Sequence, residues 1–293
     1  MHFTLRQLQV FLAVASHENV SRAAAALALS QSATSTALKE LEQRFELALF
    51  DRIGRRLKLN DQGSMLRPRA EALIAQAKEL ENTMLRHAEV GDLRVGATLS
   101  IGNYLAIGIM AAFMEDHPNS RVELTVENTA AIAAKVKNFE LDIGLVEGEL
   151  QDPELEAIYW RDDELVLFCA PDHPLAQRQA LDDAAILDAD WIVRERGSGT
   201  RQAFDRAMTG VLAELKLKLE LQHTEGIKRA VEAGLGIGCL SQLTLGEAFK
   251  RGSLVPLTAA HRNWSRRLYF IMQRQKYRSR AMASWIAHCR RPA

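Results

Sequence analysis

Two hydroxyl-rich stretches of the sequence have the composition of an anion-binding site. The first follows the β-branched run "WIV" and precedes a helical pattern, and it consists of Gly197, Ser198, Gly199 and Thr200. Glycines let the backbone turn so that several N–H groups point at one ligand, and the two hydroxyls would lie at the positive end of a helix dipole. Three arginines are close in sequence: Arg194, Arg196 and Arg201. Plain helix capping would use the same residue types.

The second stretch, "GATLSIGNY", repeats this arrangement. A strand pattern ends at residues 96–97, and Thr98, Ser100 and Asn103 precede the next helical pattern. If the two stretches belong to two lobes, two helix N-termini would meet in the cleft between the lobes. A small oxyanion or carboxylate is the ligand that such a pair of loops would take, and plain capping remains the alternative for each loop.

A carboxylate is expected to face the same cleft. Glu147 ends the apolar run "DIGLV", and a negative side chain beside a bound anion is unfavourable on Coulomb grounds. It could share a proton with a protonated ligand such as bisulfite. Alternatively, it could orient serine or arginine donors and repel competing carboxylates. The residues alone leave both roles open.

Other chemistries find little support. "GLGIG" (residues 234–238) precedes a strand pattern instead of following one, which argues against a dinucleotide site. The eight histidines lack HExxH spacing, no GxSxG stretch is present, and Cys169, Cys239 and Cys289 lie far apart. We therefore expect no metal, no cofactor, no catalytic residue, and thiols that are buried and inert.

The elements that carry the two hydroxyl-rich stretches follow an α/β pattern. From residue 92 onward, short β-branched runs alternate with helical stretches, which predicts parallel sheets in two lobes joined by crossing strands near residues 165–168 and 268–271. Residues 262–291 carry nine Lys or Arg and no acid. This basic tail could be a solvated face, or it could neutralise acidic strands near residues 147–156.

The N-terminal part is helical and suggests a second function. After a first amphipathic helix, Ser21 is placed to cap a second, and a third begins after residues 29–30. The third helix should turn Ala33, Ala37, Leu38, Leu41 and Phe45 inward. Gln31, Ser32, Ser35, Thr36 and Lys39 are left outside. Two short helices joined by a tight turn are typical of a helix-turn-helix, whose second helix enters the DNA major groove. We predict DNA contacts from these outward residues and from Ser21; the alternative is a capped helix on a water-exposed surface.

A basic hairpin is expected next. "LFDRIGRRLKLNDQG" (residues 49–63) forms two short strands around Gly54, with Arg52, Arg55 and Arg56 at the turn. Residues 44–69 carry seven Lys or Arg against three acids, although the whole chain has 37 of each sign. A local positive patch beside a helix-turn-helix suits phosphate contact.

A long helix should follow the hairpin. Asn60 can cap it, and Leu66, Ala70, Leu73, Ala77, Leu80 and Met84 form a heptad seam. Pro68 could kink it, and "HAEVGD" ends it. We expect the seam to pair with the same helix of a second copy; the alternative is packing against its own head.

The order of these parts resembles the LysR-type transcriptional regulators over essentially the whole length. The matching residues are "LRQLQVFLAVA", "AAAALALSQSATSTALKELE", "LFDR" with "LNDQG", and "AGLGIGCLS". The sequence is most similar to the YeiE-like, sulfite-responsive subgroup, through "TLSIGNYL", "DIGLVEG", "RERGSGTR" and "EGIKRAVEAGLGIGCLS". Two departures stand out: Glu46 replaces a common glycine, and Thr36 replaces a DNA-contacting arginine of many members.

The resemblance implies an α+β multi-domain fold in three parts. These are a winged helix-turn-helix domain (residues 1–59), a dimerising linker helix (60–90) and a two-lobed, periplasmic-binding-protein-like effector domain (91–293). Lobe I would take residues 91–165 and 268–293, and lobe II residues 166–267. It also implies a homodimer through the linker helix, a homotetramer on double-stranded promoter DNA, and a ligand role for Glu147.

The leading hypothesis is a cytoplasmic regulator, not an enzyme, whose promoter binding is controlled by a small anion, sulfite or a related oxyanion. No secretory leader and no membrane-length apolar stretch is found in the sequence. The first alternative is a cytoplasmic α/β solute-binding or enzymatic protein with an incidental helical head. The second is a regulator that senses redox state through Cys169 or Cys239.

Overall fold

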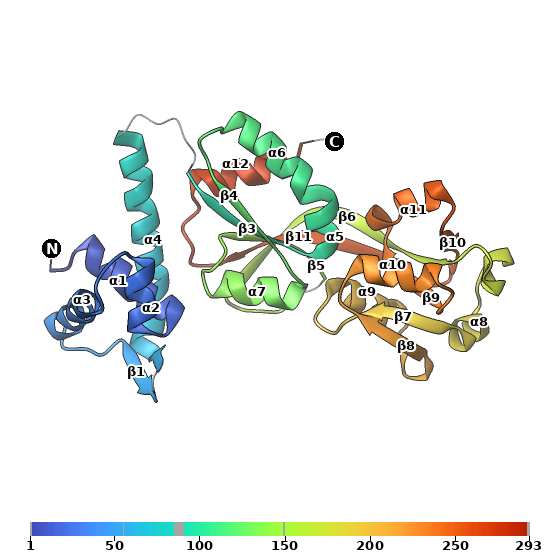
Figure 1. Ribbon diagram of the computed structural model, residues 1–293, viewed down its shortest axis with the longest axis horizontal. Helices are drawn as coiled ribbons and strands as arrows, with labels where there is room; N and C mark the ends of the chain where they lie inside the picture. Colours follow the sequence, from blue (N-terminus) through green and yellow to red (C-terminus); the bar gives the residue numbers. More distant parts are fainter. Residues whose placement is uncertain (1, 55, 85–90, 149, 292–293) are drawn as a thin grey trace.

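Three helices and a two-stranded hairpin form the head in the computed structural model, which describes residues 2–54, 56–84, 91–148 and 150–291 (Figure 1). The elements are α1 (Leu5–His17), α2 (Val20–Ala26), α3 (Gln31–Arg44), β1 (Phe50–Ile53) and β2 (Arg56–Leu59). Val10, Phe11 and Val14 of α1 are fully buried at the centre of the head core. Gly54 turns the hairpin with a φ of 62°, as the sequence predicts for this wing.

Two details of the head differ from prediction. Asn19, not Ser21, caps α2: its side chain accepts from the backbone N of Arg22 at 3.0 Å, and Ser21 is exposed in the first turn. In α3 the buried face passes through Thr34, and the predicted inward residues Ala33 and Phe45 are exposed. Thr34 can be buried because its hydroxyl donates to the carbonyl oxygen of Ser30 at 3.0 Å.

The linker helix α4 (Asp61–Met84) starts as predicted, since Asn60 accepts from the backbone N of Gly63 at 2.9 Å. Pro68 lies inside it. The first half of the predicted seam packs against the head core, through Leu66 and Ala70. Leu80 and Met84 are 61% and 74% exposed, so the seam that remains available to a second copy is the second half.

The remaining strands form one sheet that runs through both lobes (Figure 1). They are β3 (Leu93–Ala97), β4 (Val122–Val126), β5 (Ile143–Glu147), β6 (Leu155–Cys169), β7 (Asp190–Arg194), β8 (Lys216–Leu221), β9 (Ile237–Ser241), β10 (Val255–Leu257) and β11 (Ser265–Gln273). The order is β4-β3-β5-β11-β6-β9-β7-β8, with β10 paired to β6.

Two long strands join the lobes. β6 pairs with β11 up to Glu164 and with β9 from Leu165 onward, while β11 pairs with β5 from Leu268 onward. The chain therefore crosses near residues 161–165 and 265–268, slightly earlier in each strand than predicted. Within each lobe, β3 is parallel to β4 and β5, and β7 is parallel to β8 and β9, whereas the short β10 is antiparallel to β6.

Helices cover both lobes of the sheet. Lobe I carries α5 (Leu99–Ile101), the π-helical turn η1 (Gly102–Ala106), α6 (Ile107–Asp116), α7 (Thr129–Lys137) and α12 (Arg280–Cys289). Lobe II carries η2 (Pro174–Gln177), α8 (Asp183–Asp188), α9 (Gly199–Ala207), η3 (Leu212–Glu214), α10 (Thr224–Glu232), η4 (Gln242–Thr244) and α11 (Gly246–Arg251). Each lobe has its own buried aromatic centre, Trp285 in lobe I and Trp191 in lobe II.

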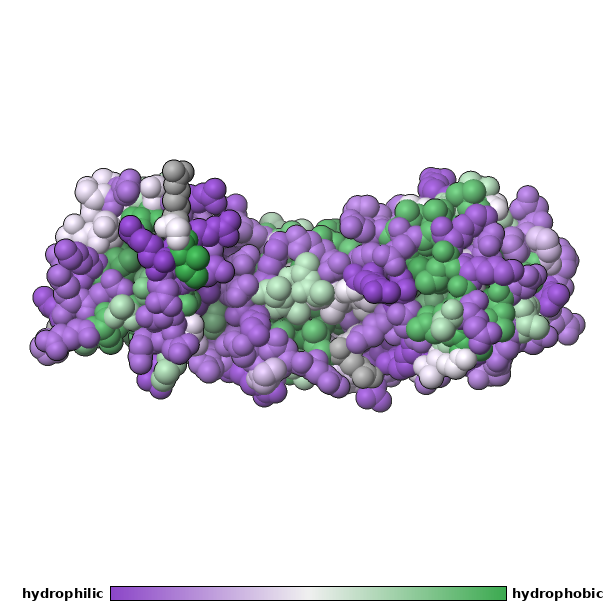
Figure 2. All heavy atoms as spheres, turned by 90° about the horizontal axis from the view of Figure 1, so that it is seen from below, coloured by the Kyte–Doolittle hydropathy of each residue, from purple (hydrophilic) through white to green (hydrophobic). Residues whose placement is uncertain are grey.

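The surface is mainly hydrophilic on the face shown in Figure 2, with hydrophobic side chains gathered mostly over the lobe II end.

The basic tail, residues 262–291, makes ion pairs with acids: Arg278 lies 2.5 Å from Glu156, and Arg266 lies 3.5 Å from Glu147. Arg266 thus neutralises a buried acid, whereas Arg267, Arg274, Arg290 and Arg291 are exposed, so this segment combines both roles. No helix in the described ranges combines the length and apolarity needed to cross a bilayer.

Candidate functional site

The first turns of α3 form an exposed polar surface on the head. Gln31, Ser32, Ser35, Thr36 and Lys39 are all exposed. Their helix begins at a well-made cap, because the Ser30 hydroxyl accepts from the backbone N of Ala33 at 3.1 Å. The positive end of the helix dipole therefore faces outward beside short hydroxyl side chains, an arrangement that suits phosphate and base-edge contacts.

The wing gives the head a basic edge. Arg52 and Arg56 of the wing are exposed, and Arg56 makes only a loose pair with Glu18 at 3.7 Å. Arg55 lies outside the described residues. A hollow of about 390 Å³ separates the wing from the start of α2, and Arg22 and Arg56 both line it. Sequence reasoning missed Arg22, whose proximity to the wing depends on the fold.

The loop between α3 and the wing also explains one departure from the family pattern. Glu46, where a glycine is common, adopts a left-handed φ of 51°. The glycine-type turn is therefore retained by a residue with a side chain, at some cost in backbone strain.

Glu147 is the centre of a buried hydrogen-bond network that joins the two lobes. Its carboxylate, at the end of β5, is 1% exposed. Thr98 of lobe I donates to Oε2, and Thr200 of lobe II donates to Oε1 at 3.3 Å. The Thr129 hydroxyl donates to the carbonyl oxygen of Glu147 at 2.9 Å and accepts from the backbone N of Gly199 at 3.1 Å. Both predicted loops thus meet at one carboxylate.

Arg266 supplies the positive charge of this network. Its Nε lies 2.7 Å from Oδ2 of Asp163, and its Nη1 donates to Oγ1 of Thr200 at 2.8 Å and lies 3.5 Å from Oε1 of Glu147. Ser241 donates to both oxygens of Asp163, at 3.0 and 2.8 Å. One buried cation therefore faces two buried carboxylates.

Sequence reasoning missed Arg266. The available signal was strand alternation, since Arg266 and Leu268 are buried while Arg267 between them is exposed. In a strand, alternate residues face opposite sides, so a charged residue in register with buried ones points into the protein.

Several buried polar atoms of these loops have no hydrogen-bond partner within the described parts of the chain: Ser100 Oγ, Ser198 Oγ, Arg194 Nη1 and Arg266 Nη2. Ser198 is the N-cap residue of α9 but its side chain makes no capping hydrogen bond, and the same holds for Thr98 at α5. A buried polar group left unpaired costs about 1–3 kcal/mol. Such a set is typical of a site whose polar atoms are completed by a ligand.

The other predicted residues divide into two groups. Arg194 is buried, but its guanidinium pairs with Glu195 at 2.8 Å, and Arg201 pairs with Asp205 at 2.7 Å. Asn103 and Gly197 are exposed. Arg194 thus keeps one buried nitrogen, Nη1, without a partner in the described part of the chain, whereas Asn103 does not share the burial of Ser100.

Gly199 permits the close contact between the lobes. A Cβ at this position would collide with the carbonyl oxygen of Glu147. Any other residue would therefore push α9 away from β5. The glycine predicted to form a backbone nest also sets how tightly the lobes meet.

The three cysteines are free and buried. Burial raises the pKa of Cys169 to about 11 and that of Cys289 to about 12, and it raises the pKa of Cys239 further. Thiols in such surroundings are poor nucleophiles, because the reactive form is the thiolate. Across the described residues, no group of three His, Cys, Asp or Glu side chains is arranged to hold a metal ion.

Comparison with known proteins agrees with this architecture. Residues 5–64 match the model of the bacterial regulatory helix-turn-helix protein, lysR family, and residues 86–293 match the LysR substrate binding domain. The chain is 40% identical over 289 residues to the HTH-type transcriptional regulator YeiE of Escherichia coli (strain K12), covering 99% of this chain and 98% of that one.

Two further similarities extend the comparison. The RuBisCO operon transcriptional regulator of Allochromatium vinosum is 32% identical over 287 residues, which cover 97% of this chain and 95% of that one. The fold matches full-length OxyR from Pseudomonas aeruginosa with a TM-score of 0.76 at 20% identity, over 100% of this chain and 99% of that one. The chain therefore belongs to the family of LysR-type transcriptional regulators, with a DNA-binding helix-turn-helix head and an effector-binding domain.

Proposed function

We propose that a small oxyanion, sulfite in the first instance, binds between the lobes and controls promoter binding by the head. The observation that carries this proposal is the set of unpaired buried donors around Glu147, above all Ser100 Oγ, Ser198 Oγ and Arg266 Nη2. Hydroxyl and guanidinium groups are the donors that anions accept, and α9 adds the positive end of its dipole.

The acidic residue in this site narrows the class of ligand. The buried charges of Arg266, Asp163 and Glu147 sum to minus one if all three are ionised. A fully deprotonated carboxylate ligand would add repulsion, whereas a ligand that carries a proton can donate it to a Glu147 oxygen. This argument favours bisulfite, the protonated form of sulfite, over sulfate or simple carboxylates.

Calorimetry with sulfite tests the site. Ser198→Ala and Ser100→Ala each remove one donor without filling the space, and we expect each to weaken binding by about 1.5–3 kcal/mol, roughly 10- to 150-fold. Asn103→Ala is the matched control, because Asn103 lies three residues after Ser100, in η1, and is exposed. Unchanged affinity in both serine variants would refute the placement of the ligand.

The same proposal covers the DNA contacts and the assembly. The head is proposed to contact promoter DNA in the cytoplasm through Ser21, Gln31, Ser32, Ser35, Thr36, Lys39, Arg52, Arg55 and Arg56.

The exposed second half of the α4 seam, with Leu73, Leu80 and Met84, is proposed to pair two copies of the chain. Two such dimers are proposed to form a tetramer. Sedimentation of a Leu80→Glu variant tests this pairing, because a buried charge in the seam should shift the protein toward monomers.

The redox alternative is disfavoured by the chemistry of the thiols. Cys169 and Cys239 are both buried, with pKa values raised by burial. Redox-sensing cysteines are exposed and have lowered pKa values. A small anion therefore accounts better for the buried polar network than oxidation of a thiol does.

A further inference from the structure

The linker helix is fastened to lobe I at two places. At the first, Arg67 of α4 donates to the carbonyl oxygen of Asn138, and its guanidinium lies 5.4 Å from the centre of the Phe139 ring. Lys276 lies at the same distance, 5.4 Å, from the centre of that ring. Phe139 is thus held by one cation from the linker helix and one from lobe I.

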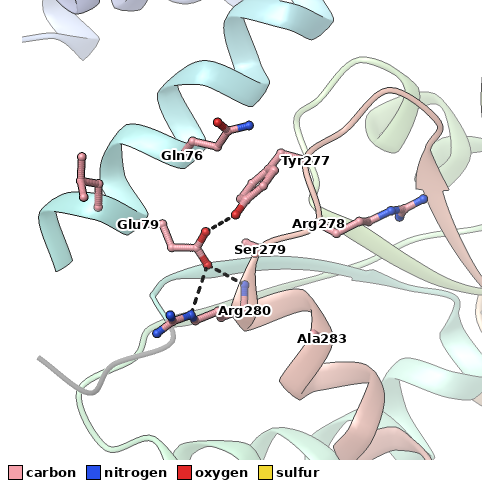
Figure 3. Close-up of a pocket in the computed structure, with 8 residues that line it drawn as sticks. Gln76, Glu79, Tyr277, Arg278, Ser279, Arg280 and Ala283 are labelled. Atoms are coloured by element: carbon pink, nitrogen blue, oxygen red, sulfur yellow. Dashed lines mark hydrogen bonds and ion pairs between the residues drawn. The ribbon is translucent and has the colours of Figure 1, made fainter. Parts of the chain in front are cut away.

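The second place is the start of α12 (Figure 3). The Glu79 carboxylate of α4 accepts from the hydroxyl of Tyr277 and, at 3.0 Å, from the backbone N of Arg280. The Arg280 guanidinium lies 3.9 Å away. A carboxylate at a helix N-terminus is stabilised by the unpaired N–H groups there. Glu79 therefore anchors the far part of α4 to lobe I.

The first contact involves a buried side chain on a strained backbone, so it differs from a contact between two exposed side chains. Phe139 is 5% exposed and has a φ of 59°, which is unfavourable for a bulky side chain. Burial raises the pKa of Glu71 on α4, while Asp142 opposite pairs with Lys276 at 2.9 Å. Strain of this kind persists only where surrounding contacts hold it, and it gathers at switching sites.

Two rigid elements run from the Glu147 network to these contacts. α7 starts at Thr129, which bonds both Glu147 and Gly199, and it ends at Lys137, directly before Asn138 and Phe139. In Figure 1, α7 lies between the linker helix and lobe II.

The second element is β11. It carries Arg266 near its first residue and ends at Gln273, three residues before Lys276 and four before Tyr277. Each element thus contacts the network at one end and, at the other, leads within a few residues to a segment that contacts the linker helix.

We propose that α7 and β11 transmit the state of the effector site to the linker helix, with the contact of Arg67 on Asn138 and Phe139 as the joint. This inference rests on the proposed function, since it names how that same site regulates the head. Opening or filling the site displaces Thr129 and Arg266, and both elements carry the displacement to α4. The head is packed on α4 through Leu66 and Ala70, so it moves with the helix.

Arg67→Ala tests the joint by measuring coupling. DNA affinity is determined with and without sulfite, and sulfite affinity with and without DNA. Coupling between two sites is reciprocal and typically 5- to 150-fold. We expect coupling in the unmodified chain and a several-fold smaller coupling in Arg67→Ala, in which the contact of Glu79 with Tyr277 remains, with each affinity measured alone changing little. Arg69→Ala, an exposed arginine two residues along the same helix, should keep the coupling.

Coupling in Arg67→Ala equal to that in Arg69→Ala would refute the proposal that the Arg67 contact is the joint.

A second measurement needs no ligand: Thr129→Val removes the hydroxyl at the far end of α7, and amide hydrogen exchange is followed along α4. Faster exchange around residues 67–71 supports the joint, and unchanged exchange there contradicts it. If sulfite fails to bind the unmodified chain, the proposed effector is wrong, and the exchange measurement alone decides the joint.

Discussion

Replacing Arg266 with methionine should destabilise the effector domain strongly. The side chains of Arg266, Asp163 and Glu147 are 1%, 4% and 1% exposed, so the substitution leaves two carboxylates buried without their cation. Methionine fills similar space with apolar atoms, so the loss of charge dominates over any cavity. Removing one partner of a buried ion pair typically costs about 3–5 kcal/mol.

Tryptophan fluorescence during urea unfolding can measure this loss. Trp160, Trp191, Trp264 and Trp285 are the four tryptophans of the chain, and all lie in the effector domain. The signal is therefore not mixed with unfolding of the head. With a urea dependence near 2–3 kcal/mol per M, the midpoint should fall by roughly 1–2 M.

A double variant separates the charge effect from other causes. Arg266→Met with Asp163→Asn should recover part of the loss, because the amide carries no charge and its oxygen still accepts from Ser241. Arg267→Met is the control: this neighbour is 68% exposed in its side chain, so the midpoint should hardly move. An Arg266→Met midpoint equal to that of Arg267→Met would refute the account of a buried charge network.

Three further outcomes are expected. Ser35→Asp should abolish specific DNA binding in gel shifts, and Arg52→Ala should lower the salt dependence of DNA binding by about one counterion. Gln43→Ala, at the exposed far end of α3, is the control and should change neither DNA affinity nor its salt dependence. The thiols of the native protein should resist a thiol reagent near neutral pH and react on unfolding, and rapid labelling of the native protein would contradict the raised pKa values. The triple Cys→Ser variant should keep its effector response. For Asp142, burial alone would raise the pKa, but Lys276 and Arg94 lower it from 3.8 to about 2. Its contribution of about 2 kcal/mol to the free energy of unfolding should therefore be complete above pH 4 and lost as the pH falls toward 2. An Asp142→Asn variant with the same acid unfolding as the parent would refute this contribution.

Local signals in the sequence predict much of this molecule. Ser30 before α3, Asn60 before α4 and Gly54 in the wing act through neighbours in the chain, so their residue types suffice. The two hydroxyl-rich loops follow the same logic in part: their residue types predict the helix starts at α5 and α9, although plain capping and anion binding both use them. The error at α2 has a local cause as well: Asn19 and Ser21 are both good caps, and the left-handed turn at Glu18 selects the earlier one.

Contacts between distant segments could not be predicted in this way. Arg266 reaches Thr200 across 66 positions of the chain, and Glu79 reaches Tyr277 across 198. No pattern near these residues in the sequence predicts which distant residue each one contacts. Thr34 shows that a polar residue type does not always predict exposure, because its hydroxyl is hydrogen-bonded inside its own helix and the side chain is buried in the core.

The position of β11 has a consequence for synthesis of the chain. β11 lies between β5 and β6, and with α12 it supplies Phe270 and Trp285 to the core of lobe I, yet both elements are made after the other strands and helices of the two lobes. The head core, by contrast, is complete once residue 74 has been made. A growing chain on the ribosome can therefore complete its DNA-binding head early, while its effector domain stays without a central strand until residues 265–289 have emerged. Translation that stops short of β11 would release a folded head on an unfinished sensor, which could occupy promoters without answering to any effector.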